Sequence, residues 1–217
     1  MTRPPFTKER LAHPRQERVV GVELPPELSR RRYIGSLWLI TLVALTLCAG
    51  EVICGYLASS DVLLADGAAW IYDVGIYGLA ALSFGRAKSV EQRAAFALAA
   101  ILGIGGFHGA YEIWNAIADP THDKADNLTI TAIIDIVGSF AEAALLFRFR
   151  VSHDPVVEAT WLSARNSVLT STVGAAVTLI FQTISVQWPQ IVVDAFGVFL
   201  VFQAAVVVIR DAKAGRW

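Results

Sequence analysis

The stretch Leu63-Leu-Ala-Asp-Gly-Ala-Ala-Trp-Ile-Tyr-Asp-Val74 is the most informative part of the chain about both fold and function. It is apolar and rich in small residues, yet it holds two carboxylates, Asp66 and Asp73. The two acids are about two helical turns apart, so they would share one face of a helix. A charged group at membrane depth is costly and is retained where it faces a bundle interior, a partner or an ion path. If this stretch crosses a bilayer, both acids are candidate functional residues.

The composition is that of a membrane protein. The 217 residues are 55% hydrophobic and only 17% charged, and the mean hydropathy is +0.52. An ordinary soluble domain has more charge and fewer apolar residues. Cys48 and Cys54 both fall within one predicted helix, so they form no disulfide framework. The sequence contains no phosphate-binding loop, nucleophile elbow or catalytic triad, and we predict that the protein is not an enzyme.

The apolar residues form six windows, each long enough for a helix that crosses the hydrocarbon core, which takes about 20 residues. We therefore predict an all-α bundle of six transmembrane helices over residues 33–210. The predicted helices cover residues 33–57, 62–84, 94–118, 128–147, 156–185 and 189–209. Residues 1–32 are predicted to form a partly disordered tail, and residues 211–217 a short tail with no soluble C-terminal domain. The glycines between Gly103 and Gly109 predict that the third helix closely approaches a neighbour.

The basic residues predict the orientation. Eight of the 18 Lys and Arg precede residue 33, and others lie between the second and third helices, between the fourth and fifth, and after the sixth. The alternate loops, 59–61, 119–127 and 186–188, hold only Lys124. The positive-inside rule therefore places both termini in the cytoplasm. This charge pattern gives no sign of nucleic-acid binding, and we expect a multi-pass protein of a prokaryotic cytoplasmic membrane.

The first helix pair carries a family resemblance. The segment Glu51-Val-Ile-Cys-Gly-Tyr-Leu-Ala-Ser-Ser-Asp-Val-Leu-Leu-Ala-Asp-Gly-Ala-Ala-Trp-Ile-Tyr-Asp-Val74 resembles the helix 1 to helix 2 junction of the cation diffusion facilitator (cation efflux) family. Tyr111-Glu112, Asp194-Ala-Phe-Gly and the small residues of 159–171 are also similar. The resemblance covers roughly residues 32–212. It implies the six-helix transmembrane domain of proton-coupled exporters of zinc and related divalent ions.

The resemblance also implies a transport site, which in this family is made of two ligand pairs, each spaced i, i+4, on helices 2 and 5. By position these pairs fall on Ala69 and Asp73 and on Ser163 and Ser167. Alanine offers no donor, and serine hydroxyls are poor zinc ligands. The implied site is therefore a degenerate one of Asp73, Ser163 and Ser167, with oxygen donors that suit manganese, magnesium or iron(II) better than zinc. Asp66 matches a position that is not a ligand, and we expect it to have a structural or pathway role.

A second cation site is conceivable at His108 and Glu112, which have the ligand-compatible i, i+4 spacing. Two side chains do not complete a tetrahedral shell, so this site would also need Asp135 or Glu142. The alternative is a hydrogen-bonded pair packed between helices. The acidic loop 119–126 either attracts cations or is a solvated turn.

Arg165 is the one basic residue inside a predicted span, and it lies too deep for its side chain to reach the interface easily. We expect it to neutralise one of three carboxylates, Asp73, Asp135 or Glu142. If Asp73 is the partner, the guanidinium takes the place of a metal ion and the protein does not transport.

Two functions follow. The first is a divalent-cation transporter that exchanges its ion for protons at a non-standard site, without a cofactor. The alternative is a non-transporting structural or regulatory membrane subunit, as the missing ligands and the missing soluble domain suggest. The expected partners are the lipid bilayer, a divalent cation, protons and a second membrane subunit, most simply a second copy of the chain.

Overall fold

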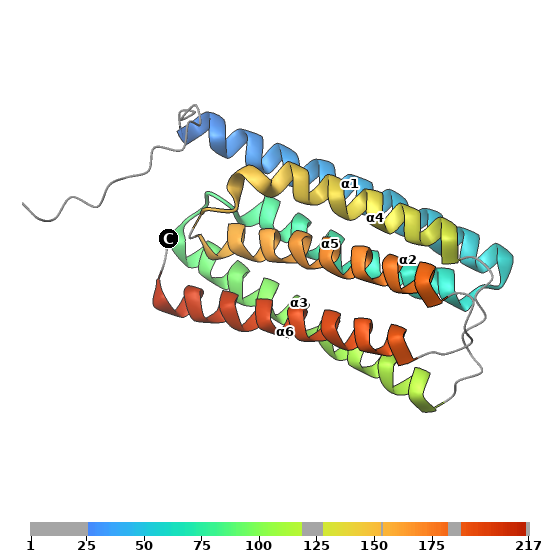
Figure 1. Cartoon of the computed structure of the whole chain (residues 1–217). Coiled ribbons are helices and arrows are strands. Elements are labelled where there is room, and N and C mark those ends of the chain that lie inside the picture. Colours follow the sequence, from blue (N-terminus) through green and yellow to red (C-terminus); the bar gives the residue numbers. More distant parts are fainter. Residues whose placement is uncertain (1–25, 119–127, 153, 182–187, 216–217) are drawn as a thin grey trace, which may run out of the picture.

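The computed structural model describes residues 26–118, 128–152, 154–181 and 188–215. These residues form six α-helices and one short 3-10 helix, shown in Figure 1, and no strand lies among them. The elements are α1 (Pro26–Ala58), α2 (Asp61–Ser83), α3 (Lys88–Ala118), α4 (Leu128–Leu146), η1 (Phe147–Phe149), α5 (Pro155–Phe181) and α6 (Trp188–Ala214). The predicted all-α fold class is confirmed.

The helices extend beyond the apolar windows at several ends. α1 begins at Pro26 and α3 at Lys88, whereas the windows begin at residues 33 and 94. α6 likewise continues to Ala214, past the window end at 209. An apolar window marks only the part of a helix suited to lipid, and the helical hydrogen bonds continue through the polar turns beyond it.

Local signals explain two of the helix starts. Ser59 takes a left-handed backbone conformation (φ 51°) that reverses the chain, and the Ser60 hydroxyl then accepts a hydrogen bond from the Leu63 N–H at 3.4 Å. Before α5, Asp154 Oδ1 accepts hydrogen bonds from the N–H groups of Val156 (2.8 Å) and Val157 (3.3 Å). Ser60 and Asp154 are therefore N-caps. Their side chains accept hydrogen bonds from N–H groups that have no partner within the helix.

The helices pack as a closed ring. Each helix contacts the next in the order α1, α2, α3, α6, α5, α4. The ring closes because α4 also contacts α1. α5 also contacts α2 and α3 across the ring. In Figure 1, α3 and α6 lie side by side along one edge of the bundle, and α1 and α4 lie along the opposite edge. α5 therefore reaches across the interior of the ring to α2 and α3.

Glycines set the closest helix approaches. A Cβ at Gly67 of α2 would lie 2.8 Å from Val52 Cγ2 on α1. A Cβ at Gly109 of α3 would lie 2.9 Å from Val198 Cγ2, and one at Gly106 would lie 3.0 Å from the Phe202 ring, both on α6. The prediction that the third helix closely approaches a neighbour is confirmed at these two glycines.

A cluster of buried residues lies at the end of the bundle where α1 begins. Tyr33 is buried there, and its hydroxyl shares a 2.7 Å hydrogen bond with Thr160 Oγ1 of α5. Its ring meets Phe84 and Phe149 edge-on, with centroids 4.6 and 4.8 Å apart. These contacts join α1, α2, η1 and α5 at one end.

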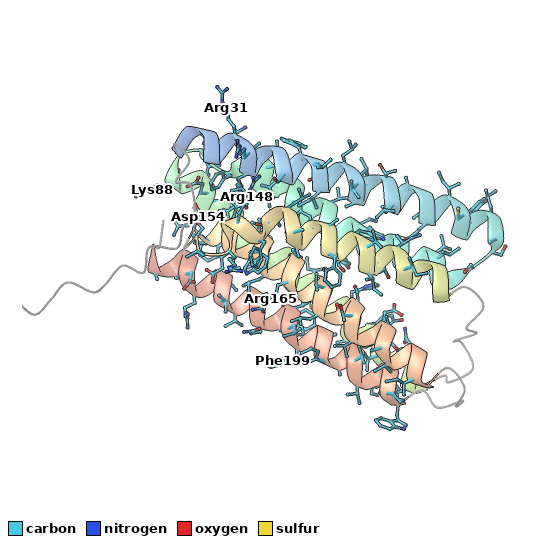
Figure 2. All side chains as sticks on the ribbon, turned by 45° about the horizontal axis from the view of Figure 1, so that its top comes forward. Arg31, Lys88, Arg148, Asp154, Arg165 and Phe199 are labelled. Atoms are coloured by element: carbon cyan, nitrogen blue, oxygen red, sulfur yellow. The ribbon has the colours of Figure 1, made fainter. Side chains whose placement is uncertain are left out.

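The outer surface is apolar. Leu42, Phe107 and Phe199 are 61%, 71% and 63% exposed, and Figure 2 shows Phe199 on the outside of α6. Within the described residues, three helices are long and apolar enough to cross a membrane, namely Arg30–Ala58, Lys88–Ala118 and Trp188–Ala214. The chain is thus a multi-pass integral membrane protein. The count of six spans and the cytoplasmic placement of both termini stay predictions.

Candidate cation site

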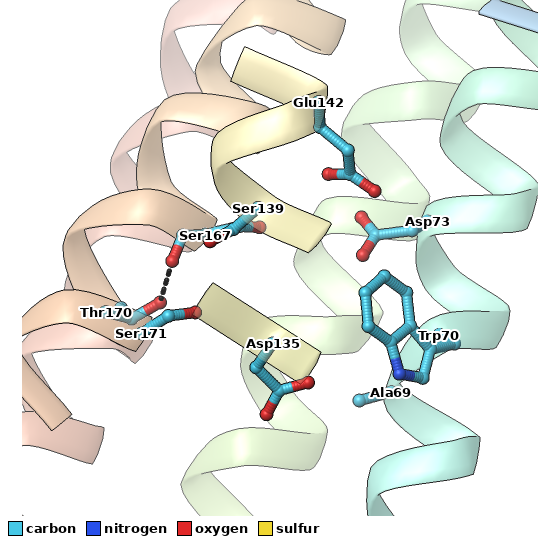
Figure 3. A pocket seen from close by; sticks show the side chains of 9 residues that line it. All are labelled: Ala69, Trp70, Asp73, Asp135, Ser139, Glu142, Ser167, Thr170 and Ser171. Carbon is cyan, nitrogen blue, oxygen red and sulfur yellow. Dashed lines mark hydrogen bonds between the residues drawn. The ribbon is translucent and has the colours of Figure 1, made fainter. Parts of the chain in front are cut away.

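A cavity of about 150 Å³ opens between α2, α4 and α5. Its walls carry carboxylates and hydroxyls (Figure 3). The lining residues are Ala69, Trp70, Asp73, Asp135, Ser139, Glu142, Ser167, Thr170 and Ser171. A water molecule takes up about 30 Å³ in the liquid, so the cavity accommodates a cation together with some of its hydration waters.

On α2, Asp73 is the one carboxylate among the described residues that line the cavity. Its Oδ1 accepts a hydrogen bond from Ser163 Oγ of α5 at 3.4 Å, a long bond that leaves the carboxylate open to other partners. Trp70 is 7% exposed and forms a wall beside Asp73. Ala69 also lines the cavity, one helical turn before Asp73, but its methyl group offers no donor.

On α4, Asp135 and Glu142 lie about two turns apart and so share a face. Glu142 is only 4% exposed. Its Oε2 accepts a hydrogen bond from the buried Tyr77 hydroxyl at 3.1 Å, and its Oε1 has no hydrogen-bond partner among the described residues. Figure 3 shows the carboxylates of Glu142 and Asp73 pointing toward one another. Two acids from different helices thus meet inside the bundle.

On α5, hydroxyl groups recur at the helical spacing. Ser163, Ser167 and Ser171 follow one another at i, i+4 and i+8, and the last two line the cavity with Thr170. The Thr170 hydroxyl donates within the helix, to the carbonyl oxygens of Asn166 (3.0 Å) and Ser167 (3.2 Å). This face adds neutral oxygen atoms to the two carboxylates opposite.

The structure brings the three residues of the predicted transport site together. Asp73 and Ser163 share a hydrogen bond, and Ser167 lines the same cavity as Asp73. Asp135 and Glu142, which the sequence offered to a second site, lie in this cavity too.

His108 and Glu112 are not part of this cavity lining. Their Nε2 and Oε1 atoms are 3.6 Å apart on α3, and the side chains are 39% and 51% exposed. The structure therefore does not bring them together with Asp135 and Glu142. Across the described ranges, no group of three or more His, Cys, Asp and Glu side chains is arranged to hold a metal ion. The Asp66 side chain and the acidic loop 119–126 fall outside the described residues.

Arg165 takes different partners from those expected. Its Nε and Nη2 donate to Asn166 Oδ1 at 3.3 and 3.0 Å, and its Nη2 also donates to Gln203 Oε1 of α6 at 3.5 Å. The predicted ion pair with Asp73, Asp135 or Glu142 is absent from the described part of the chain. The reason is helical geometry: Arg165 follows Ser163 by two residues, so its side chain leaves the helix about 200° further round, on the face toward α6.

Sequence reasoning missed the contribution of α4 to the main site. The signal was present in the spacing of Asp135 and Glu142, which puts both on one helix face. No pattern in a single sequence tells which neighbour that face meets. The potential ligands in the described lining are oxygen atoms of three carboxylates and several hydroxyl groups, and this chemistry suits hard divalent ions better than zinc.

The chain was compared with models of known protein families. The model of the cation efflux transmembrane domain matches residues 37–214, which is most of the chain and includes all three helices that line the cavity. A comparison with curated proteins finds no match.

Proposed function

The chain belongs to the cation efflux family of membrane transporters, and on this premise we propose that it exchanges a divalent cation for protons at the cavity between α2, α4 and α5. The observation that carries the proposal is the position of Asp73. This residue falls where the family resemblance implies a metal ligand, and its carboxylate lines a cavity that also holds Ser167.

The oxygen-only lining supports a hard cation as the substrate. Magnesium and manganese bind through one or two carboxylates and keep several waters, which a cavity of about 150 Å³ allows. Zinc favours a closed tetrahedral shell with histidine or thiolate ligands, and the described residues that line the cavity include neither. We therefore rank magnesium, manganese and iron(II) above zinc.

A carboxylate at this position also supports exchange for protons, because it binds either a cation or a proton. Protons that enter from one side would displace the cation to that side. The site would then be exposed to the opposite side by alternating access, ready for the next cation. We further propose that both termini lie in the cytoplasm of a prokaryotic cell and that two copies form a dimer.

Ion flux into proteoliposomes tests this function. Purified protein is reconstituted under an imposed proton gradient, and uptake of magnesium, manganese, iron(II), cobalt and zinc is compared. We expect flux of the harder ions, dissipation of the proton gradient, and loss of both in Asp73→Asn. Asp194→Asn, which removes an exposed carboxylate on α6 outside the cavity lining, is the matched control and should retain flux. Absence of flux for every ion would overturn the proposal.

The second candidate is a non-transporting membrane subunit, and Ala69 is the observation that favours it. A ligand position without a donor weakens any site of the usual kind. The partners of Arg165 count against this candidate, because the guanidinium contacts Asn166 and Gln203 and does not neutralise Asp73. A well-folded protein that carries no ion but co-purifies with a stoichiometric membrane partner would support the subunit function instead.

A further inference from the structure

We infer that Glu142 of α4 is a direct ligand of the transported cation, so that the site is completed by a third helix. The inference rests on the proposed function, since it assigns a ligand to the cation that Asp73 binds. It goes beyond the residue pairs on helices 2 and 5, because α4 carries neither pair.

The first observation is a carboxylate oxygen atom that has no hydrogen-bond partner among the described residues. Glu142 is 4% exposed, and its Oε1 accepts no hydrogen bond from any described residue. Burial of a carboxylate oxygen without a hydrogen bond or a counter-charge is costly. Figure 3 shows this side chain aimed into the cavity, toward Asp73. A cation between the two acids supplies the interaction that Oε1 lacks.

The second observation is that the carboxylate is held in place. Tyr77 is fully buried, and its hydroxyl donates to Glu142 Oε2 at 3.1 Å. Because one oxygen atom is fixed in this way, the other has a defined direction before any ion arrives. Tyr77 is therefore a positioning residue, and Glu142 is the ligand.

The third observation is charge and ligand number. Asp73 alone offers one negative charge, and Ala69 offers no donor. With Glu142, two carboxylates balance the two charges of the cation across the cavity. Hydroxyls such as that of Ser167, together with retained waters, then complete the six oxygen ligands that magnesium and manganese prefer. α4 thus compensates for the ligand that α2 lacks.

Manganese binding to the full-length protein tests the inference. Purified protein in lipid nanodiscs is titrated with Mn²⁺, and free Mn²⁺ is measured by electron paramagnetic resonance. Glu142→Gln keeps the shape of the side chain and an oxygen acceptor for Tyr77 but removes the charge. Glu142→Asp keeps the charge but withdraws the carboxylate by one methylene group. We expect both variants to bind Mn²⁺ at least about tenfold more weakly than the unsubstituted protein, while the control Asp194→Asn binds normally.

The two variants separate direct ligation from a general effect of charge. Wild-type affinity in Glu142→Asp would overturn direct ligation, and wild-type affinity in Glu142→Gln would overturn any role for the acid. If Asp73→Asn loses binding and both Glu142 variants keep it, the inference fails while the proposed function stands. If the unsubstituted protein binds no Mn²⁺ and carries no ion, both fail. Should Glu142→Gln not fold, Glu142→Asp alone decides.

Discussion

At the scale of single residues, helix register determines which polar side chains meet. Ser163 and Arg165 are two positions apart on α5, yet the serine donates to Asp73 and the arginine donates toward α6. A rotation of about 100° per residue produces this separation. The guanidinium therefore leaves the negative charge of the cavity available to a cation.

The Arg165→Ala variant tests this separation. Because Arg165 contacts Asn166 and Gln203, its removal should leave Mn²⁺ affinity within about twofold of the unsubstituted protein. Equilibrium titration in nanodiscs measures the affinity, and Asp73→Asn, which should lose binding, is the positive control. A large gain in affinity would mean that the guanidinium competes with the cation at Asp73.

Two glycines of α3 offer a matched pair for packing. A Cβ at Gly109 would lie 2.9 Å from Val198 Cγ2, whereas one at Gly103 would meet nothing within 4 Å. Gly109→Ala should therefore destabilise the protein by about 1–3 kcal/mol, the usual cost of overpacking, and Gly103→Ala should not. Thermal unfolding in detergent, followed by intrinsic fluorescence, measures the difference. Equal midpoints for the two variants would show that α3 and α6 can separate at no cost.

The residue level also shows what a single sequence can predict. Asp73, Ser163 and Ser167 could be placed together because a family register relates α2 to α5. Glu142 could not be assigned to this cavity, because intrahelical spacing defines a face but not the helix that the face meets. The partners of Arg165 were mispredicted for the same reason. The prediction considered only charge, whereas the direction in which the side chain leaves the helix determines which groups it contacts.

At the scale of elements, the site depends on where helices begin and on which faces they present. The start of α5 is fixed by Asp154, whose side chain caps the N–H groups of Val156 and Val157. This start sets the register of the serines further along the helix. Helix existence was predictable from apolar windows, whereas helix ends depend on polar caps that such windows do not detect.

Asp154→Ala should lower the free energy of unfolding by about 1 kcal/mol, the typical value of an N-cap. Asp154→Asn is the matched control, since asparagine caps about as well as aspartate. Thermal unfolding of the two variants in the same detergent makes the comparison. If the asparagine variant is destabilised as much as the alanine variant, the charge and not the cap is what stabilises α5.

Restoring the family's ligand spacing should change the metal preference. In Ala69→Asp combined with Ser167→His, α2 gains a carboxylate one turn before Asp73 and α5 gains an imidazole on the cavity wall. We expect zinc affinity to rise at least about tenfold relative to manganese, because zinc then has carboxylate and histidine ligands. The control combines Ala69→Asp with Leu169→His, which puts the imidazole at an exposed position outside the cavity lining. An equal gain in the control would show that the imidazole position is unimportant.

At the scale of the whole molecule, the ring of helices encloses a cavity with carboxylates beside a buried apolar core, and its exterior is apolar. The carboxylates of α2 and α4 face the cavity, while side chains such as Phe107 and Phe199 point outward. An apolar exterior fits a lipid environment, and carboxylates that face a cavity avoid contact with lipid.

Cysteine labelling tests the predicted topology. In a variant without Cys48 and Cys54, single cysteines are introduced as Ser59→Cys and Ser152→Cys, both at exposed positions. Three helices, α2, α3 and α4, separate the two sites. An impermeant maleimide added from outside should label position 59 in intact spheroplasts and position 152 only after lysis. Labelling of both positions from one side would mean that one of the three helices does not cross the membrane.

The contact of Gly67 with Val52 has a consequence for the evolution of the chain. A Cβ at position 67 would lie only 2.8 Å from Val52 Cγ2 and 3.2 Å from the Val52 backbone nitrogen, so a larger residue at 67 requires both a smaller side chain at 52 and a small shift of α1. The two positions are therefore under one steric constraint and should covary among relatives, with alanine or glycine at 52 wherever 67 is no longer glycine. A helix junction that identifies a family would then persist because neither position can drift alone.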